Sequence, residues 1–185
     1  APAEIFKSKN PKAFRNKGTR VFYKFYEDEG WQFMKNNFPQ HMIFLKTLRN
    51  SVVGVKSDNI TKVQKPSREL RRLISAEPKD ELLEALQNVL EFVTEHSGLH
   101  LKNFGVFGSL LHGFYHQKFS DIDLTIYGRE NMIKLRRTLQ DLYADKHSLL
   151  DNEFQNDQSI EGKNWNFQNY SMREFEWHQQ RKLIY

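Results

Sequence analysis

The sequence predicts an α+β protein, with a small mixed sheet that carries helices on one face and a small antiparallel β lobe before it. Three observations support this class. Residues 20–64 contain short aromatic and β-branched runs separated by turn residues. From Pro66 onward, apolar residues recur at helical spacing. Two apolar segments, 103–107 and 121–127, interrupt that helical pattern and are typical of buried strands.

The composition is that of a folded soluble chain of ordinary domain size. Of its 185 residues, 38% are hydrophobic and 28% are charged. No apolar run approaches the ~20 residues that a membrane-spanning helix needs, so we expect no membrane association. The segment APAEIFKSKN lacks the apolar core of a signal peptide, and we expect a cytoplasmic location. The chain has no cysteine, which excludes disulfides and thiolate metal sites.

Positive charge is concentrated in two clusters. Residues 7–24 contain seven basic side chains and no acidic one, and residues 62–72 contain five basic side chains and only Glu69 as an acid. Such clusters suit a phosphate-rich partner, and RNA is the partner that we expect first. A solvated surface explains either cluster equally well when it is taken alone.

The first part of the chain divides into an arm and a lobe. Residues 1–19 are basic and show no periodicity, which favours a flexible arm. Residues 20–64 form the expected β lobe, because strand-like runs alternate there with turn residues. The expected strands are VFYKFY, WQFM, MIFLKTL and VVGV.

Residues 65–185 form the expected second domain. Its helices are predicted from Pro66, from Pro78 to a stop at Gly98, from an N-cap at Asn131, and over 171–182. The intervening stretch 151–169 is polar and acidic, with few apolar anchors.

Asp121 and Asp123 are the first candidate site residues. Side chains in a strand alternate between faces, so these two carboxylates are expected on one face while Ile122 points to the core. Two adjacent carboxylates raise each other's pKa unless a cation lies between them. The pair is therefore a candidate seat for Mg²⁺ or Mn²⁺, which prefer oxygen ligands and commonly arrive with substrate phosphates.

Gly108 and Ser109 are the second pair of candidates. Glycine lets backbone N–H groups approach a ligand closely where the first strand ends. Ser109 adds a hydroxyl donor and is expected to open a helix over 109–114, whose first turn favours anions. Together with the aspartates, the turn would supply a cradle for a nucleoside triphosphate and a seat for its metal.

The ordered combination resembles a known family. The stretch GVFGSLLHGFYHQKFSDIDLTIYG is similar to the nucleotidyltransferase superfamily of DNA polymerase β, whose signature is hG[GS], a spacer of about nine to thirteen residues, then Dh[DE]h. More narrowly it resembles prokaryotic, largely archaeal, predicted nucleotidyltransferases with an N-terminal β region. The resemblance implies that Gly108 and Ser109 bind the triphosphate, and that Asp121 and Asp123 are the catalytic metal ligands. It also implies a nucleotidyltransferase fold.

The family pattern includes a third carboxylate on a later strand, and this chain shows no matching triplet after Tyr127. Glu153, Asp157 and Glu161 are candidates by position. A strand following the apolar ending RKLIY, in a longer protein, is the other possible source.

Neighbouring residues allow functional and purely structural interpretations. His112 and His116 are four apart in the spacer, which suits a metal pair or, more simply, solvated or substrate-facing side chains. Lys118 is close in sequence to the aspartates and could touch phosphate. Aromatic residues make up 14% of the chain, so core packing accounts for most of them.

The resulting hypothesis is a metal-dependent nucleotidyltransferase that moves a nucleoside monophosphate from a nucleoside triphosphate onto an acceptor hydroxyl. RNA is the favoured acceptor, with a protein hydroxyl or a small molecule as other choices. The alternative is a catalytically weak or inactive subunit of the same fold that binds RNA or a protein partner. In a third interpretation the motif residues only form turns.

Overall fold

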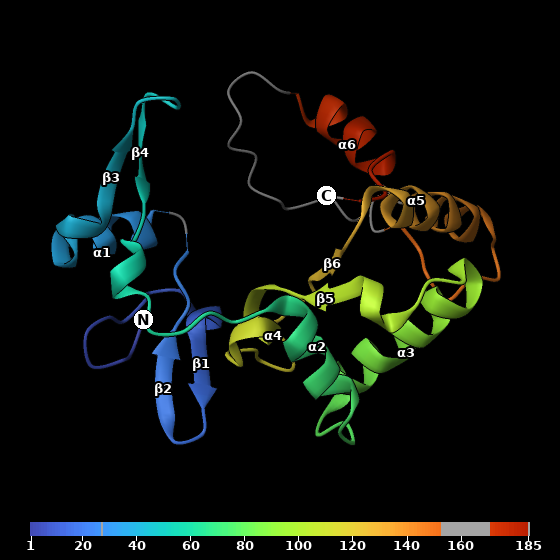
Figure 1. The fold of residues 1–185 in the computed structure, drawn as a ribbon, viewed down its shortest axis with the longest axis horizontal. Helices are drawn as coiled ribbons and strands as arrows, with labels where there is room; N and C mark the ends of the chain where they lie inside the picture. The colour runs from blue at the N-terminus through green and yellow to red at the C-terminus, as the bar shows by residue number, and fades with distance from the viewer. Residues whose placement is uncertain (27, 153–170, 185) are drawn as a thin grey trace. The chain divides into compact units, whose positions relative to one another are not determined.

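The computed structural model describes residues 1–26, 28–152 and 171–184. By its internal contacts the chain separates into two compact units. The first comprises residues 1–88 and 104–125, and the second comprises residues 89–103 and 126–185. The expected α+β class is confirmed: helices and small antiparallel sheets alternate along the chain (Figure 1).

The first unit begins with a hairpin of β1 (Phe14–Lys17) and β2 (Arg20–Tyr23), preceded by the short 3₁₀ helix η1 (Pro11–Ala13). The arm expected over residues 1–19 thus contains a paired strand. The buried side chain of Arg15 helps to explain this, because its Nη1 donates to the carbonyl oxygens of Lys12 and Phe14, both at 2.7 Å. The guanidinium of Arg15, one of the seven basic residues of the cluster 7–24, therefore forms hydrogen bonds inside the unit.

The segment WQFM, expected as a strand, lies instead in helix α1 (Glu29–Asn37). Its Phe33 packs against Phe6 and Phe25, with ring centroids 5.5 and 5.2 Å away. Glu29 fixes the first turn, since its carboxylate accepts hydrogen bonds from Tyr26 N–H and Ser8 Oγ at 2.8 Å. The strand prediction was wrong because aromatic content alone carries no helix or strand periodicity.

A second hairpin follows where the runs MIFLKTL and VVGV predict strands, but its bounds differ: residues 46–49 form the turn, and the second strand covers residues 50–53 rather than 52–55. Strand β3 (Met42–Leu45) pairs antiparallel with β4 (Asn50–Val53). Short 3₁₀ turns, η2 (Pro39–His41) and η3 (Ser57–Asn59), lie before and after the hairpin.

Helix α2 (Pro66–Ile74) begins at the predicted proline and packs against β5 (Phe104–Val106). Helix α4 (Gly108–His112) comes directly after that strand. Apolar side chains from these elements and from the start of α3 form the core of the first unit. Each of its largest members is at most 2% exposed: Phe104, Leu70, Leu86, Leu110 and Val106.

Helix α3 (Glu81–Ser97) runs from the first unit into the second; it begins at Glu81 rather than at the predicted Pro78, and it ends at Ser97, directly before the predicted stop at Gly98. Gly98 has a φ of +59°, the left-handed conformation that commonly terminates a helix. The next turn, η4 (Leu101–Asn103), leads into β5.

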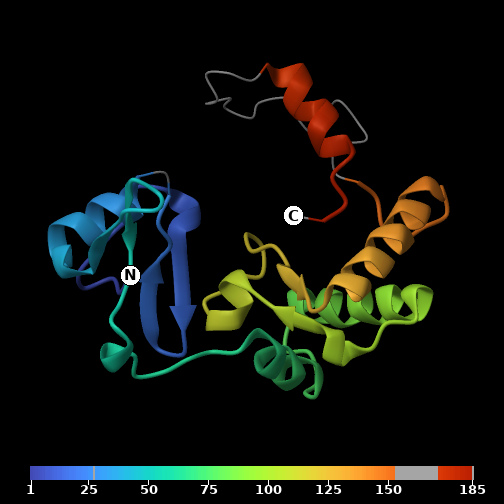
Figure 2. The ribbon, with the colours of Figure 1, turned by 45° about the horizontal axis from the view of Figure 1, so that its top comes forward.

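The second unit contains helix α5 (Arg129–Ala144) and helix α6 (Met172–Gln180), drawn in orange and red in Figure 2. Helix α5 starts two residues before the predicted cap at Asn131. The Asn131 amide instead donates to the Tyr127 carbonyl at 2.7 Å, inside the first turn. The predicted last helix is confirmed, and Ser171 closes its first turn with Glu174 in a capping box.

Candidate active site

The site is organised by β5 and its pairing with β6 (Leu124–Ile126). Phe107 N–H donates to the Asp123 carbonyl, and Tyr127 N–H donates to the Asn103 carbonyl, both at 2.8 Å. These two bonds define an antiparallel register. They also place Asp123 beside the point where the chain leaves β5; Figure 1 shows β5 and β6 side by side.

The strand expected over 121–127 is shorter than predicted, because ladder pairing begins only at Leu124. Its partner β5 has three residues, and the chain turns away after Phe107. Asp121 and Asp123 therefore lie in the irregular segment that enters β6, rather than within the strand.

Gly108 is required at its position for two reasons. Its φ of +56° is the left-handed conformation that side chains disfavour. In addition, a Cβ at this position would collide with Asp123 Oδ2, so the backbone of the turn packs directly against this carboxylate. The structure thus brings together Gly108 and Asp123, two residues that the sequence analysis chose as site candidates.

The electrostatics of Asp123 reflect this packing. Although the residue as a whole is exposed, partial burial of its carboxylate raises its pKa above the ordinary value, and the negative charge of Asp121 raises it further. The positive charge of Lys24 acts in the opposite direction. A carboxylate crowded by burial and by a like charge is an environment that a bound cation would relieve.

Ser109, next to Gly108, has a buried hydroxyl. Its Oγ makes no hydrogen bond to any residue that the structure describes. Such a group costs about 1–3 kcal/mol, so its presence calls for an explanation. A polar ligand held at the turn would provide the missing partner. Helix α4 has only five residues, so its few aligned peptide dipoles would add little to the attraction of an anion at this turn.

Lys24 is a further candidate residue for the site, and no sequence motif indicates it. It follows β2, and its backbone N–H donates to the Ala13 carbonyl at 2.8 Å. In the sequence it was one of seven basic residues in the cluster 7–24. Only the fold shows that its charge acts on Asp123.

The spacer between the two motif halves is held from both sides. Lys17 Nζ donates to the His112 carbonyl at 2.7 Å, and His112 Nδ1 lies 2.6 Å from Gln64 Oε1. Phe114 packs on Phe22 with ring centroids 4.6 Å apart. The N-terminal hairpin therefore braces the helix that follows the Gly-Ser turn.

Tyr115 anchors the same spacer through a second contact. Its hydroxyl donates to Asp80 Oδ2 at 2.7 Å. Burial and the neighbouring Asp80 carboxylate raise the pKa of Tyr115 to about 12, so the phenol keeps its proton and the hydrogen bond persists at neutral pH.

The remaining spacer candidates have structural partners. His116 stacks on Phe119 at 4.5 Å between ring centroids, and its Nδ1 accepts from Lys118 N–H at 3.2 Å. With His112 bound to Gln64, these contacts favour the simpler interpretation over a histidine metal pair. In the second basic cluster, Arg72 pairs with Glu69 at 2.6 Å.

The candidates for a third carboxylate, Glu153, Asp157 and Glu161, lie outside the described residues. Across residues 1–26, 28–152 and 171–184, no group of three or more metal-ligating side chains gathers at one place. The donor set that the structure does describe at the motif is the pair Asp121 and Asp123.

Comparison with known protein families identifies the class. Residues 86–178 match the nucleotidyltransferase domain family, and this interval covers just over half of the chain. The chain therefore belongs to that family. The matched interval contains the Gly-Ser turn and both aspartates, but not Lys17, Lys24 or Gln64. No curated protein and no solved structure matches the chain.

Within the described parts of the chain, every helix is too short or too polar to cross a lipid bilayer.

Proposed function

We propose that this chain is a metal-dependent nucleotidyltransferase that transfers a nucleoside monophosphate from a nucleoside triphosphate to an acceptor hydroxyl, with RNA as the favoured acceptor. The observation that carries the proposal is the packing of the Gly108 backbone against the Asp123 carboxylate, with the charge of Asp121 close by. Membership of the nucleotidyltransferase domain family supports the general reaction.

The motif residues have separable roles in this proposal. Asp121 and Asp123 would hold Mg²⁺ or Mn²⁺, and their oxygens are the ligands that such ions prefer. A divalent ion bound there supplies charge neutralisation to the triphosphate and to the attacking oxygen. The unpartnered Ser109 hydroxyl would donate to a phosphate oxygen, and Gly108 would let the backbone approach it.

The reaction exchanges the phosphoanhydride bond between the α- and β-phosphates for a phosphoester bond to the acceptor. The acceptor oxygen forms a bond to the α-phosphorus and loses its proton, while the bond to the β-phosphate oxygen breaks and pyrophosphate leaves with the electron pair. The protein contributes mainly position and charge to such a step. Lys24 would add positive charge beside the crowded carboxylates.

A transfer assay with a matched control tests the proposal. The full chain is incubated with Mg²⁺ or Mn²⁺, labelled nucleoside triphosphates and an RNA pool, and label on RNA is measured. The double substitution Asp121→Asn and Asp123→Asn should lower transfer by roughly 100-fold or more, since the charge that holds the ion is lost. Asp141→Asn, which changes an exposed acid on α5, should leave transfer unchanged.

Transfer by the double variant at the wild-type rate would overturn the assignment of these residues. If the wild-type protein bound RNA without transferring any label, under any of the triphosphates, the alternative of an inactive binding subunit would replace the enzyme.

A further inference from the structure

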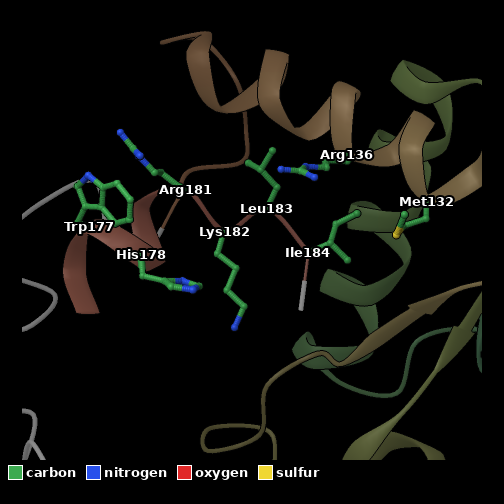
Figure 3. A pocket seen from close by; sticks show the side chains of 8 residues that line it. All are labelled: Met132, Arg136, Trp177, His178, Arg181, Lys182, Leu183 and Ile184. Atoms are coloured by element: carbon green, nitrogen blue, oxygen red, sulfur yellow. The ribbon is translucent and has the colours of Figure 1, made fainter. Parts of the chain in front are cut away.

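The second unit contains a pocket of about 400 Å³ that lies outside the motif (Figure 3). Its wall is formed by α5, by the end of α6 and by the residues that follow α6. The residues involved are about 45 positions apart in sequence, and neither the Gly-Ser turn nor the two aspartates belongs to them.

The polar lining is basic. Among the described residues it consists of Arg136 from α5, His178 from α6, and Arg181 and Lys182 just after α6, and none of these described lining residues is acidic. Arg136 and Arg181 form no ion pair with any residue in the described part of the chain. Like charges gathered around one concave space repel one another, and an anion placed among them would relieve that repulsion.

Arg181 is held in a defined orientation by Trp177. Its guanidinium lies over the indole ring, with Cζ 3.9 Å from the ring centroid, as Figure 3 shows. Stacking uses the face of the guanidinium and leaves the N–H donors at its edge available. Those edge donors match the oxygens of a phosphate group in a bidentate arrangement.

The rest of the wall is apolar. Met132, Leu183 and Ile184 contribute it, while Trp177 remains 57% exposed. Apolar side chains beside a stacked arginine and tryptophan suit a planar heterocycle rather than a bare inorganic ion. The volume is within the range of pockets that accept small organic groups.

We propose that this pocket binds one nucleotide of a single-stranded nucleic acid, with its base against the Trp177 and Arg181 planes and the phosphates on either side of it at the basic side chains Arg181 and Arg136. The site would hold the RNA acceptor, so the inference rests on the proposed function for its biological meaning. The binding of the nucleic acid itself does not depend on the proposed function, because it needs neither triphosphate nor metal. An acidic peptide would supply the negative charge but not the flat ring for which the apolar wall is suited.

Binding is tested on the full chain by fluorescence anisotropy with labelled single-stranded RNA and DNA oligonucleotides, in the presence of EDTA. Arg136→Gln and Arg181→Gln should each weaken binding about five-fold or more and reduce the slope of log affinity against log salt by about one. Trp177→Leu should weaken it by about five- to one-hundred-fold, because base stacking is lost. Arg137→Gln, the neighbouring exposed arginine that does not line the pocket, should change affinity by less than about two-fold.

Controls separate this inference from the proposed function. The Asp121→Asn, Asp123→Asn variant should bind single strands like the wild type, even if it transfers no label. A duplex of the same sequence should bind more weakly, because its bases stay stacked, and the RNA and DNA arms show whether the sugar is discriminated. The pocket assignment is overturned if Arg136→Gln and Arg181→Gln behave like Arg137→Gln. It is also overturned if an acidic peptide competes as well as the single strand, or if duplex and single strand respond identically to the three pocket variants.

Discussion

Two of the small antiparallel sheets, β5–β6 and β3–β4, are similar in size but differ in their surroundings. In β5 every residue is buried, and helix α2 packs against the strand. In the β3–β4 hairpin most of the large apolar side chains are exposed to solvent, and Phe44 is 61% exposed. Strand pairing is thus common to both sheets, while extensive packing of a helix on a strand is seen at β5.

This difference bears on where chemistry can be placed. A side chain at the end of a buried, helix-backed strand is held by its surroundings, whereas one on an exposed hairpin is free to move. The Gly-Ser turn and Asp123 lie at the end of the buried strand β5. Four predictions test how far the contrast between the two sheets extends.

The largest effect is expected from truncating the core of the buried sheet. Phe104→Ala should lower the free energy of unfolding by about 3–5 kcal/mol, because Phe104 is 2% exposed and its removal leaves a cavity. Phe44→Ala in the open hairpin should change it by less than about 0.5 kcal/mol. Urea denaturation of both variants measures the difference, and equal losses would show that the two sheets are packed alike.

The second prediction compares two glycines that follow strands. Gly108→Ala should cost about 1–2 kcal/mol for the left-handed backbone alone, and more because Asp123 must move. Gly54→Ala after β4 should cost less, since its new Cβ would meet only the flexible end of Ile43. If the proposed function is right, a nucleoside triphosphate with Mg²⁺ should raise the Tm of the wild type and of the Gly54 variant but not that of the Gly108 variant. A Gly108 variant that keeps the full increase would contradict the tight turn.

The third prediction concerns the spacer that joins β5 to β6. Tyr115→Phe should cost about 1 kcal/mol, through loss of the hydrogen bond to Asp80. Since the pKa of Tyr115 is raised to about 12, its contribution is complete below the ordinary tyrosine pKa and is lost as the pH rises towards 12. Comparing the ultraviolet titration of the wild type with that of Tyr115→Phe isolates this residue. Ionisation at an ordinary tyrosine pKa would show that the bond does not form.

The smallest effect concerns the charge of Asp123. A raised pKa means that the fold favours the protonated carboxyl, so this stabilisation is complete at low pH and is lost as the pH rises through the raised pKa. Without divalent ions, Asp123→Asn should therefore have a slightly higher Tm than the wild type at neutral pH and the same Tm in acid. A lower Tm at neutral pH would show that the carboxylate is stabilised by its surroundings.

The sequence predicted the existence of β5, β6 and the turn at Gly108, though not the length of β6, because their signals are local. Apolar runs at 103–107 and 121–127, with Gly108 between them, identify strands and a bend within one short window. The helices from Pro66 and up to Gly98 were equally clear, since proline and glycine mark helix ends by backbone geometry.

Other features depend on distant residues and left no local signal. The aromatic run around Phe33 became a helix because Phe6 and Phe25 cover it. In the sequence, Lys24 cannot be distinguished from the other lysines of the cluster 7–24, and only the fold shows that its charge acts on Asp123. The pocket lined by Arg136 and Arg181 combines two segments that are about 45 residues apart, and no local sequence pattern links them.

The packing of α2 on β5 has a practical consequence for recombinant work. Shortening the gene to the family-matched stretch, residues 86–178, would delete Leu70 and Leu73, which are 1% and 7% exposed. The fragment would then expose the apolar surface of Phe104 and Val106 to water, and we expect it to aggregate during expression. Boundaries for a minimal soluble version should be set upstream of Pro66.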